Sequence, residues 1–95
     1  MNKRRVLNIE AMPRLAPHVH FRFDKKRERW VVLAPERLLL PDEIAVEVLK
    51  LCDGSLSIAA MVASLTERYE ISDETASKDV LELLQDLTDK GILAV

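Results

Sequence analysis

Three residues in this sequence carry an imidazole or a thiol, groups that bind transition metals or act in nucleophilic catalysis, namely His18, His20 and Cys52. Because His18 and His20 are two residues apart, both imidazoles would lie on one face of a β-strand and could contact the same ion. No third ligand follows at a recognisable spacing, and no base accompanies Cys52 to activate its thiol. With two glycines in the whole chain, a phosphate-binding loop is also absent. We therefore expect no catalytic residues, no metal site and no cofactor.

The segment that contains the two histidines has the alternation of a β-hairpin. In residues 18–23 the apolar side chains come at every second position, as one buried face of a strand requires. Residues 24–28 are all charged and form the expected loop. Residues 29–34 return as a second strand, rich in β-branched and aromatic side chains.

A third, very short strand is predicted at Arg37–Leu40, between Pro35 and Pro41. Proline cannot donate to a central ladder, so a strand bounded in this way belongs at a sheet edge, where its free backbone groups can pair with an extended peptide. Its side chains alternate between two faces, with Leu38 and Leu40 on one and Arg37 and Leu39 on the other. The pattern does not decide which face is buried, and burial of all three leucines under the helices is the alternative.

Helical periodicity replaces the strand pattern after Pro41. The predicted N-caps are Asp42, Ser57 and Ser72, and the three helices are expected to end at Gly54, near Tyr69, and at Lys90 before Gly91. On the first helix the buried stripe is expected to consist of Ile44, Ala45, Val48, Leu49 and Cys52. A Schellman ending at Gly91 would place Ile92 against Leu87. These elements predict an α+β fold of winged-helix type, with an N-terminal three-stranded antiparallel sheet followed by three helices.

The third helix has three faces. Val80 and its neighbours Ala76, Leu83, Leu84 and Leu87 form the core stripe. Between this stripe and the charged face lies an uncharged shoulder, which consists of Ser77, Leu81, Gln85 and Thr88. This shoulder could border a peptide groove, and packing of Leu81 against another helix or the N-terminal segment is the alternative.

Charge is divided unevenly along the chain. Residues 1–37 carry ten Lys and Arg against four Asp and Glu, a net charge of +6, whereas residues 38–95 carry four against twelve, a net charge of −8. We expect a mobile or loosely docked arm at residues 1–14 and a single domain at residues 15–95. No export signal or membrane span is recognised, and the single cysteine fits a reducing compartment, so the sequence predicts a cytoplasmic protein.

A winged-helix outline with a basic N-terminal part also suggests a DNA-binding regulator. In the common docking mode the third helix enters the major groove, where its side chains lie among phosphates. Here that helix carries six acidic residues against two lysines. Because an anionic helix is repelled by the duplex, DNA binding is the less favoured alternative.

Several motifs resemble the PqqD family of pyrroloquinoline quinone (PQQ) synthesis proteins. The resemblance rests on the segment 33–37 (Leu-Ala-Pro-Glu-Arg), the turn 51–54 (Leu-Cys-Asp-Gly), the capped second helix and the ending from Leu87 to Leu93. It extends over about Pro13 to Val95, and the specificity lies in the order and spacing of the motifs. The resemblance implies a non-catalytic protein that binds a ribosomally made precursor peptide and presents it to a radical S-adenosylmethionine (SAM) enzyme.

In that family the peptide pairs with the third strand and lies against the third helix, which correspond here to Arg37–Leu40 and Ser72–Lys90. The predicted peptide-binding residues are therefore Arg37, Leu38, Leu39, Leu40, Ser77, Leu81, Gln85 and Thr88. The basic arm, with Lys3, Arg4, Arg5 and Arg14, is the expected docking element for the enzyme. Nucleic acid and membrane are not expected partners, and monomer and dimer both remain open.

Overall fold

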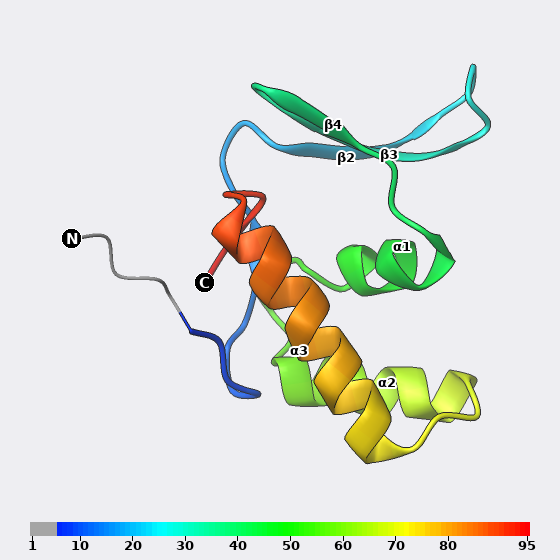
Figure 1. The fold of residues 1–95 in the computed structure, drawn as a ribbon, viewed down its shortest axis with the longest axis vertical. Coiled ribbons are helices and arrows are strands. Elements are labelled where there is room, and N and C mark those ends of the chain that lie inside the picture. Colours follow the sequence, from blue (N-terminus) through cyan, green and yellow to red (C-terminus); the bar gives the residue numbers. More distant parts are fainter. Residues whose placement is uncertain (1–5) are drawn as a thin grey trace.

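The computed structural model describes residues 6–95 and contains two small sheets and three helices (Figure 1). The elements in chain order are β1 (Arg14–Leu15), β2 (His20–Asp24), β3 (Arg29–Ala34), β4 (Arg37–Leu39), α1 (Glu43–Lys50), α2 (Ile58–Arg68), α3 (Asp73–Asp89) and β5 (Leu93–Ala94). The predicted α+β fold, with a three-stranded antiparallel sheet followed by three helices, is confirmed. Its likeness to a winged helix stays a prediction. The second sheet, formed by β1 and β5, was not expected.

The three-stranded sheet has the order β2-β3-β4 and lies at one end of the molecule, with α1 next to it (Figure 1). The central strand β3 pairs antiparallel with both neighbours, in a register that places Val32 between Phe21 and Leu39. The predicted bounds of β3 are confirmed, and β4 is one residue shorter than predicted.

Aromatic side chains connect the β2–β3 hairpin to α1. Phe21 stacks on Trp30 at 4.7 Å between ring centroids, and Phe23 meets the same ring edge-on at 6.0 Å. The ammonium of Lys50 lies 5.2 Å from the Trp30 ring centroid, a cation–π contact from the end of α1. His18 precedes β2 and has a φ of 72°, so the prediction that both histidines lie on one strand face is wrong.

All three predicted N-caps are confirmed, because each side chain accepts a hydrogen bond from a backbone N–H of the first turn. The donors are Ala45 N for Asp42 (2.8 Å), Ala60 N for Ser57 (3.1 Å) and Thr75 N for Ser72 (3.2 Å). The predicted Schellman ending of α3 is also confirmed. Ile92 N donates to Leu87 O at 2.9 Å, and Gly91, at a φ of 76°, donates to Thr88 O at 3.0 Å.

Two details of α1 differ from the sequence prediction. The helix ends at Lys50 with Leu51 as its C-cap, so Gly54 lies beyond it in a turn, where its N–H donates to Pro13 O at 3.0 Å. Ile44 is 40% exposed, and Val46 is buried instead. The Lys50 contact with Trp30 shows that α1 also meets the sheet, and a periodicity drawn from one helix does not include such a neighbour.

The core lies where α2 and α3 meet Leu7 and the last residues of the chain. Its most deeply buried side chains include Ile58, Met61, Leu84 and Ile92, and Val32 adds the inner face of the sheet. Each such side chain contributes about 1.5–3 kcal/mol through burial. The sheet, the helices and the last residues therefore share a single core.

Within the expected arm at residues 1–14, the described residues 7–13 pack against this core. Leu7 and Pro13 are buried. The N–H groups of Ile58 and Ala59, which have no partner within α2, donate to Ala11 O and Ile9 O at 2.9 Å each. The segment is held in place because its carbonyl groups accept hydrogen bonds from the first N–H groups of α2. The expected boundary between residues 14 and 15 falls inside β1.

Deleting residues 1–12 should therefore lower the free energy of unfolding by about 3 kcal/mol, through the loss of Leu7 burial and of the two hydrogen bonds to α2. Deleting residues 1–5 removes none of the contacts described here and is the matched control. Denaturant unfolding followed by circular dichroism measures both. Equal stability of the two truncated proteins would contradict the packing of residues 6–12.

Candidate functional site

The β4 strand borders an apolar groove and leaves one side of its backbone open. Among residues 6–95, β4 pairs with β3 alone, so the groups on its other side meet no strand. Next to this edge is a cavity of about 140 Å³ between the sheet, α1 and α3. Its lining is almost wholly apolar and consists of Val32, Leu39, Leu40, Pro41, Ala45, Leu49, Leu83 and Leu87. An open strand edge beside an apolar cavity is the arrangement that strand addition by a peptide requires.

The structure decides which face of β4 is buried. Leu39 packs against the core cluster, whereas Leu38 is 42% exposed on the opposite face. Leu40 follows the strand, lines the groove and is 47% exposed. Arg37 is exposed at the start of the strand, and the alternative that all three leucines are covered by helices is excluded.

On α3, the residues that face β4 are Leu83 and Leu87. These two side chains were assigned to the core stripe from the sequence. Leu87 is buried, but Leu83 is only partly covered and therefore remains available to a ligand. The structure thus assigns Leu83 to the groove, and sequence reasoning missed it as a site residue.

The predicted shoulder of α3 lies next to the N-terminal segment and not at the β4 groove. Leu81 and Gln85 border a hollow with Val6 and Leu7, and the Gln85 Oε1 accepts a hydrogen bond from Leu7 N at 2.9 Å. Ser77 lines another hollow with Ile9 and α2. The Thr88 hydroxyl donates to Leu84 O at 2.7 Å within the helix. The structure therefore does not bring Ser77, Leu81, Gln85 and Thr88 together with β4, and the alternative packing of Leu81 is the one observed.

The physical reason is the position of the N-terminal segment. The shoulder is uncharged, which is compatible with contact to a peptide or to another part of the same chain. In this fold Val6 and Leu7 lie beside Leu81 and Gln85 on that side of α3, and Ile9 lies near Ser77. A helical wheel separates faces but does not say which neighbour covers each one.

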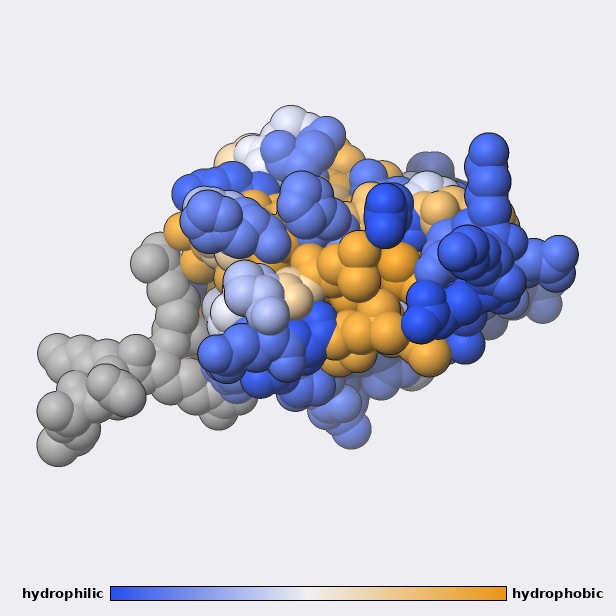
Figure 2. All heavy atoms as spheres, turned by 90° about the horizontal axis from the view of Figure 1, so that it is seen from above, coloured by the Kyte–Doolittle hydropathy of each residue, from blue (hydrophilic) through white to orange (hydrophobic). Residues whose placement is uncertain are grey.

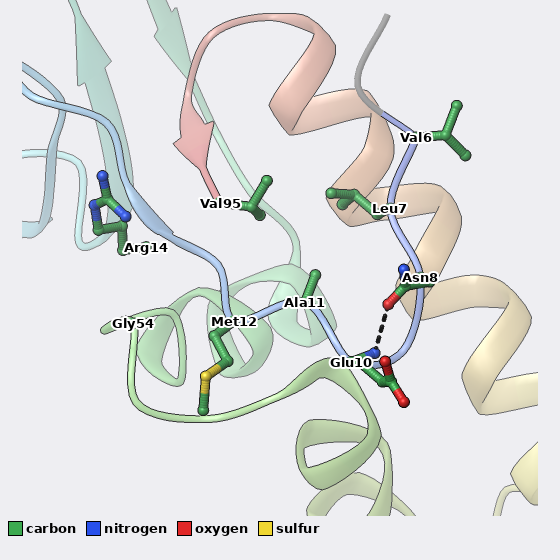
Figure 3. Close-up of a pocket in the computed structure, with 9 residues that line it drawn as sticks. All are labelled: Val6, Leu7, Asn8, Glu10, Ala11, Met12, Arg14, Gly54 and Val95. Carbon is green, nitrogen blue, oxygen red and sulfur yellow. Dashed lines mark hydrogen bonds between the residues drawn. The ribbon is translucent and has the colours of Figure 1, made fainter.

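A second and larger hollow, of about 540 Å³, lies between this segment, the turn at Gly54 and the last residue Val95 (Figure 3). Its charged lining residues are Glu10 and Arg14, and Asn8 accepts a hydrogen bond from Glu10 N at 2.9 Å. Of the residues predicted to dock an enzyme, Arg14 lies here. Lys3, Arg4 and Arg5 are outside the described residues.

Cys52 is enclosed by the core. Its side chain is 5% exposed, and its thiol donates to Val48 O at 3.3 Å. Desolvation, together with the nearby charge of Asp53, raises the pKa of the Cys52 thiol to about 12. A thiol held in this protonated form behaves as a small buried hydrophobe, which agrees with its assigned place on the α1 stripe.

The shifted carboxylates stabilise turns and helix contacts outside the groove. A hydrogen bond from Arg68 lowers the pKa of Glu47, and the pair, 2.9 Å apart, connects α1 to α2. A hydrogen bond from Arg27 lowers the pKa of Asp24 in the hairpin turn. Within residues 6–95, His, Cys, Asp and Glu form no group of three that could hold a metal ion. No helix in this range is long and apolar enough to cross a membrane.

Comparison with solved structures finds the same fold in two PqqD proteins. The truncated PqqD part of Methylobacterium extorquens PqqCD, described as a stand-alone recognition element for ribosomally synthesised and post-translationally modified peptides, is 37% identical. It matches with a TM-score of 0.73 over 87% of this chain and 88% of that one. PqqD from Xanthomonas campestris is 31% identical, with a TM-score of 0.60 over 94% of this chain and 99% of that one. A lasso peptide synthetase B1, at 21% identity and a TM-score of 0.78, shares the fold over 90% of this chain and all of its own.

Sequence comparison gives the same result. A protein named "PqqA binding protein" from Rhodopseudomonas palustris (strain HaA2) is 50% identical over 84 residues, which is 88% of this chain and 82% of the relative. One from Xanthomonas oryzae pv. oryzae (strain PXO99A) is 34% identical over 88% of this chain and 91% of its own. The family model for coenzyme PQQ synthesis protein D matches residues 29–93, from the start of β3 to β5. The resemblance seen in the sequence is thereby confirmed, and this chain belongs to the PqqD family.

Proposed function

We propose that this chain binds a ribosomally made precursor peptide of PQQ synthesis and presents it to a radical SAM enzyme. The observation that carries the proposal is the open edge of β4 beside the apolar groove. Relatives that are 50% and 34% identical are named for binding PqqA, and a relative of known structure is described as a peptide-recognition element. In this proposal the chain binds a peptide as those relatives do, and its own binding site is the open edge of β4.

In the proposed complex the peptide adds to β4 as a further strand. Each backbone hydrogen bond to Arg37–Leu39 contributes about 0.5–1.5 kcal/mol, without regard to the peptide's sequence. Alternate peptide side chains point to opposite faces of the sheet, so one of them enters the groove against Leu39 and Leu83. Backbone pairing thus supplies affinity, and the apolar groove selects an aliphatic or aromatic side chain.

Presentation requires no chemistry from this chain. A flexible peptide loses conformational entropy when an enzyme fixes it in one conformation. If this chain already holds the peptide extended, less entropy is lost when the enzyme binds it. The absence of a reactive thiol at Cys52 is in keeping with such a role. We propose the chain as a peptide chaperone on these grounds.

Replacing Leu83 with Asp should weaken binding of the precursor at least about tenfold, because a carboxylate would have to be desolvated in the apolar groove. Leu81→Asp is the matched control: it makes the same change two residues earlier, on the side of α3 that contacts residues 6–7. It should lower the thermal midpoint but leave the affinity of the folded protein within about twofold. Calorimetric titration of the synthetic precursor measures both, and the reverse pattern would restore the shoulder of Leu81 as the binding face.

Amide hydrogen exchange tests strand addition directly. Exchange at residues 37–40 should slow about tenfold or more when saturating precursor is added, because free N–H groups of β4 acquire partners. The other edge of the same sheet, β2, provides an internal control, and exchange at residues 20–24 should stay unchanged. Protection at β2 without protection at β4 would assign the peptide to the opposite edge.

We further propose that the basic residues Lys3, Arg4, Arg5 and Arg14 attract the enzyme during encounter. Charges of this kind act mainly on association rates, and their effect falls with salt. Deleting residues 1–5 should reduce the association rate with the radical SAM enzyme about threefold or more at low salt and leave precursor affinity unchanged. Stopped-flow measurements at two salt concentrations provide the test, and an unaltered association rate would rule out this role.

A further inference from the structure

The ladder of the edge strand ends before the groove does. Its last pair is Val32 with Leu39, whereas the groove is also lined by Leu40 and Pro41, which follow β4. Leu40 is 47% exposed, and an apolar area lies between hydrophilic regions when the molecule is viewed from the side of the sheet (Figure 2). Leu40 and Pro41 therefore border the groove without belonging to the ladder, and their position depends on other contacts.

Arg29 supplies such a contact from the central strand. Its Nη2 donates a hydrogen bond to Pro41 O at 3.2 Å. Arg29 is the first residue of β3, and the antiparallel register, continued beyond Val32 and Leu39, brings the exit of β4 next to this end of β3. Because proline has no N–H to donate to a ladder, the Arg29 side chain provides the connection between the two strands at this point.

The link between β4 and α1 (residues 40–42) is thus held at two points. Arg29 connects Pro41 to the sheet. Asp42, the next residue, accepts a hydrogen bond from Ala45 N on its side chain at 2.8 Å and one from Val46 N on its carbonyl at 2.9 Å. If the hydrogen bond to Arg29 is lost, the link keeps only its attachment to the first turn of α1, and that turn loses its connection to β3.

Arg29 reaches Pro41 from outside the groove. Pro41 borders two hollows, the apolar groove and another of about 560 Å³ between the tip of the β2–β3 hairpin and α1. Arg29 lines the second hollow and is not among the residues that line the groove. A peptide side chain in the groove would therefore meet Leu40 and Pro41, and Arg29 would act on it through Pro41.

We infer that Arg29 is a positioning residue for the peptide, because it holds Leu40 and Pro41 where they line the groove. The inference rests on the proposed function of the β4 edge. Ordering a flexible backbone segment on binding loses conformational entropy, and less is lost when the segment is already fixed in the free chain. Removing this hydrogen bond should therefore weaken peptide binding, although Arg29 lies outside the groove.

The test titrates the synthetic precursor into the full chain and three variants. Arg29→Met keeps a long aliphatic side chain, removes the donor and should weaken binding about fivefold. Arg29→Lys keeps a cationic donor and should bind more tightly than Arg29→Met. Arg22→Met is the matched control: it removes the same charge from an exposed arginine of β2 and should leave the affinity within about twofold of wild type. Wild-type affinity in Arg29→Met would overturn the inference.

Amide hydrogen exchange in the free chain, followed by NMR, separates positioning from direct contact with the peptide. In Arg29→Met, exchange at Ala45 and Val46 should be about threefold faster or more, because the turn that Asp42 caps has lost its connection to the sheet. Exchange at Val32 should stay unchanged, since β3 keeps both neighbouring strands. Weaker precursor binding with unaltered exchange at Ala45 and Val46 would overturn the inference, because Arg29 would then contact the peptide itself.

Two further observations decide what a loss of binding means. The thermal midpoint of Arg29→Met should lie within about 2 °C of wild type, and a much larger fall would make Arg29 a residue of general stability and overturn its positioning role. A wild-type chain that fails to bind precursor refutes the proposed function. The exchange rates at Ala45 and Val46 in the free variant still decide whether Arg29 holds the link.

Discussion

The arrangement of the site depends on one backbone constraint, the one-sided pairing of β4. Strand β3 satisfies one side of Arg37–Leu39, and the chain then leaves the sheet at Pro41 and enters α1. Because proline lacks an N–H, the ladder cannot continue past that point. The short strand keeps a free side, and α1 and α3 provide an apolar lining beside it. The groove is therefore a consequence of where the strand stops.

The N-terminal segment has a complementary structural role. Its carbonyl groups at Ile9 and Ala11 accept the first N–H groups of α2, and Leu7 enters the core. In doing so it covers the side of α3 away from β4. The two sides of α3 therefore have different neighbours. One side lies beside residues 6–7, and the other presents Leu83 to the groove next to β4.

The basic first part and the acidic second part of the sequence place their charges on different elements of the fold. Of the basic residues that the structure describes in the first part, most lie on the three-stranded sheet or in the turn between β2 and β3. Six of the twelve acidic residues of the second part lie on the exposed side of α3. The basic and acidic residues thus lie on different parts of the surface, because the three-stranded sheet and α3 occupy different parts of the molecule (Figure 1).

The sequence by itself determined the local elements. Alternation in the hairpin, the proline-bounded strand, the caps Asp42, Ser57 and Ser72, and the Schellman ending at Gly91 depend on neighbours within a few residues, so their signals are local. Its motifs, in their order and spacing, also indicated the family. Tertiary structure decided what those elements face. Leu83 lies in the groove and Leu81 under the N-terminal segment because residues far apart in the chain cover one side of α3 and leave the other open, and helical periodicity carries no information about such distant contacts.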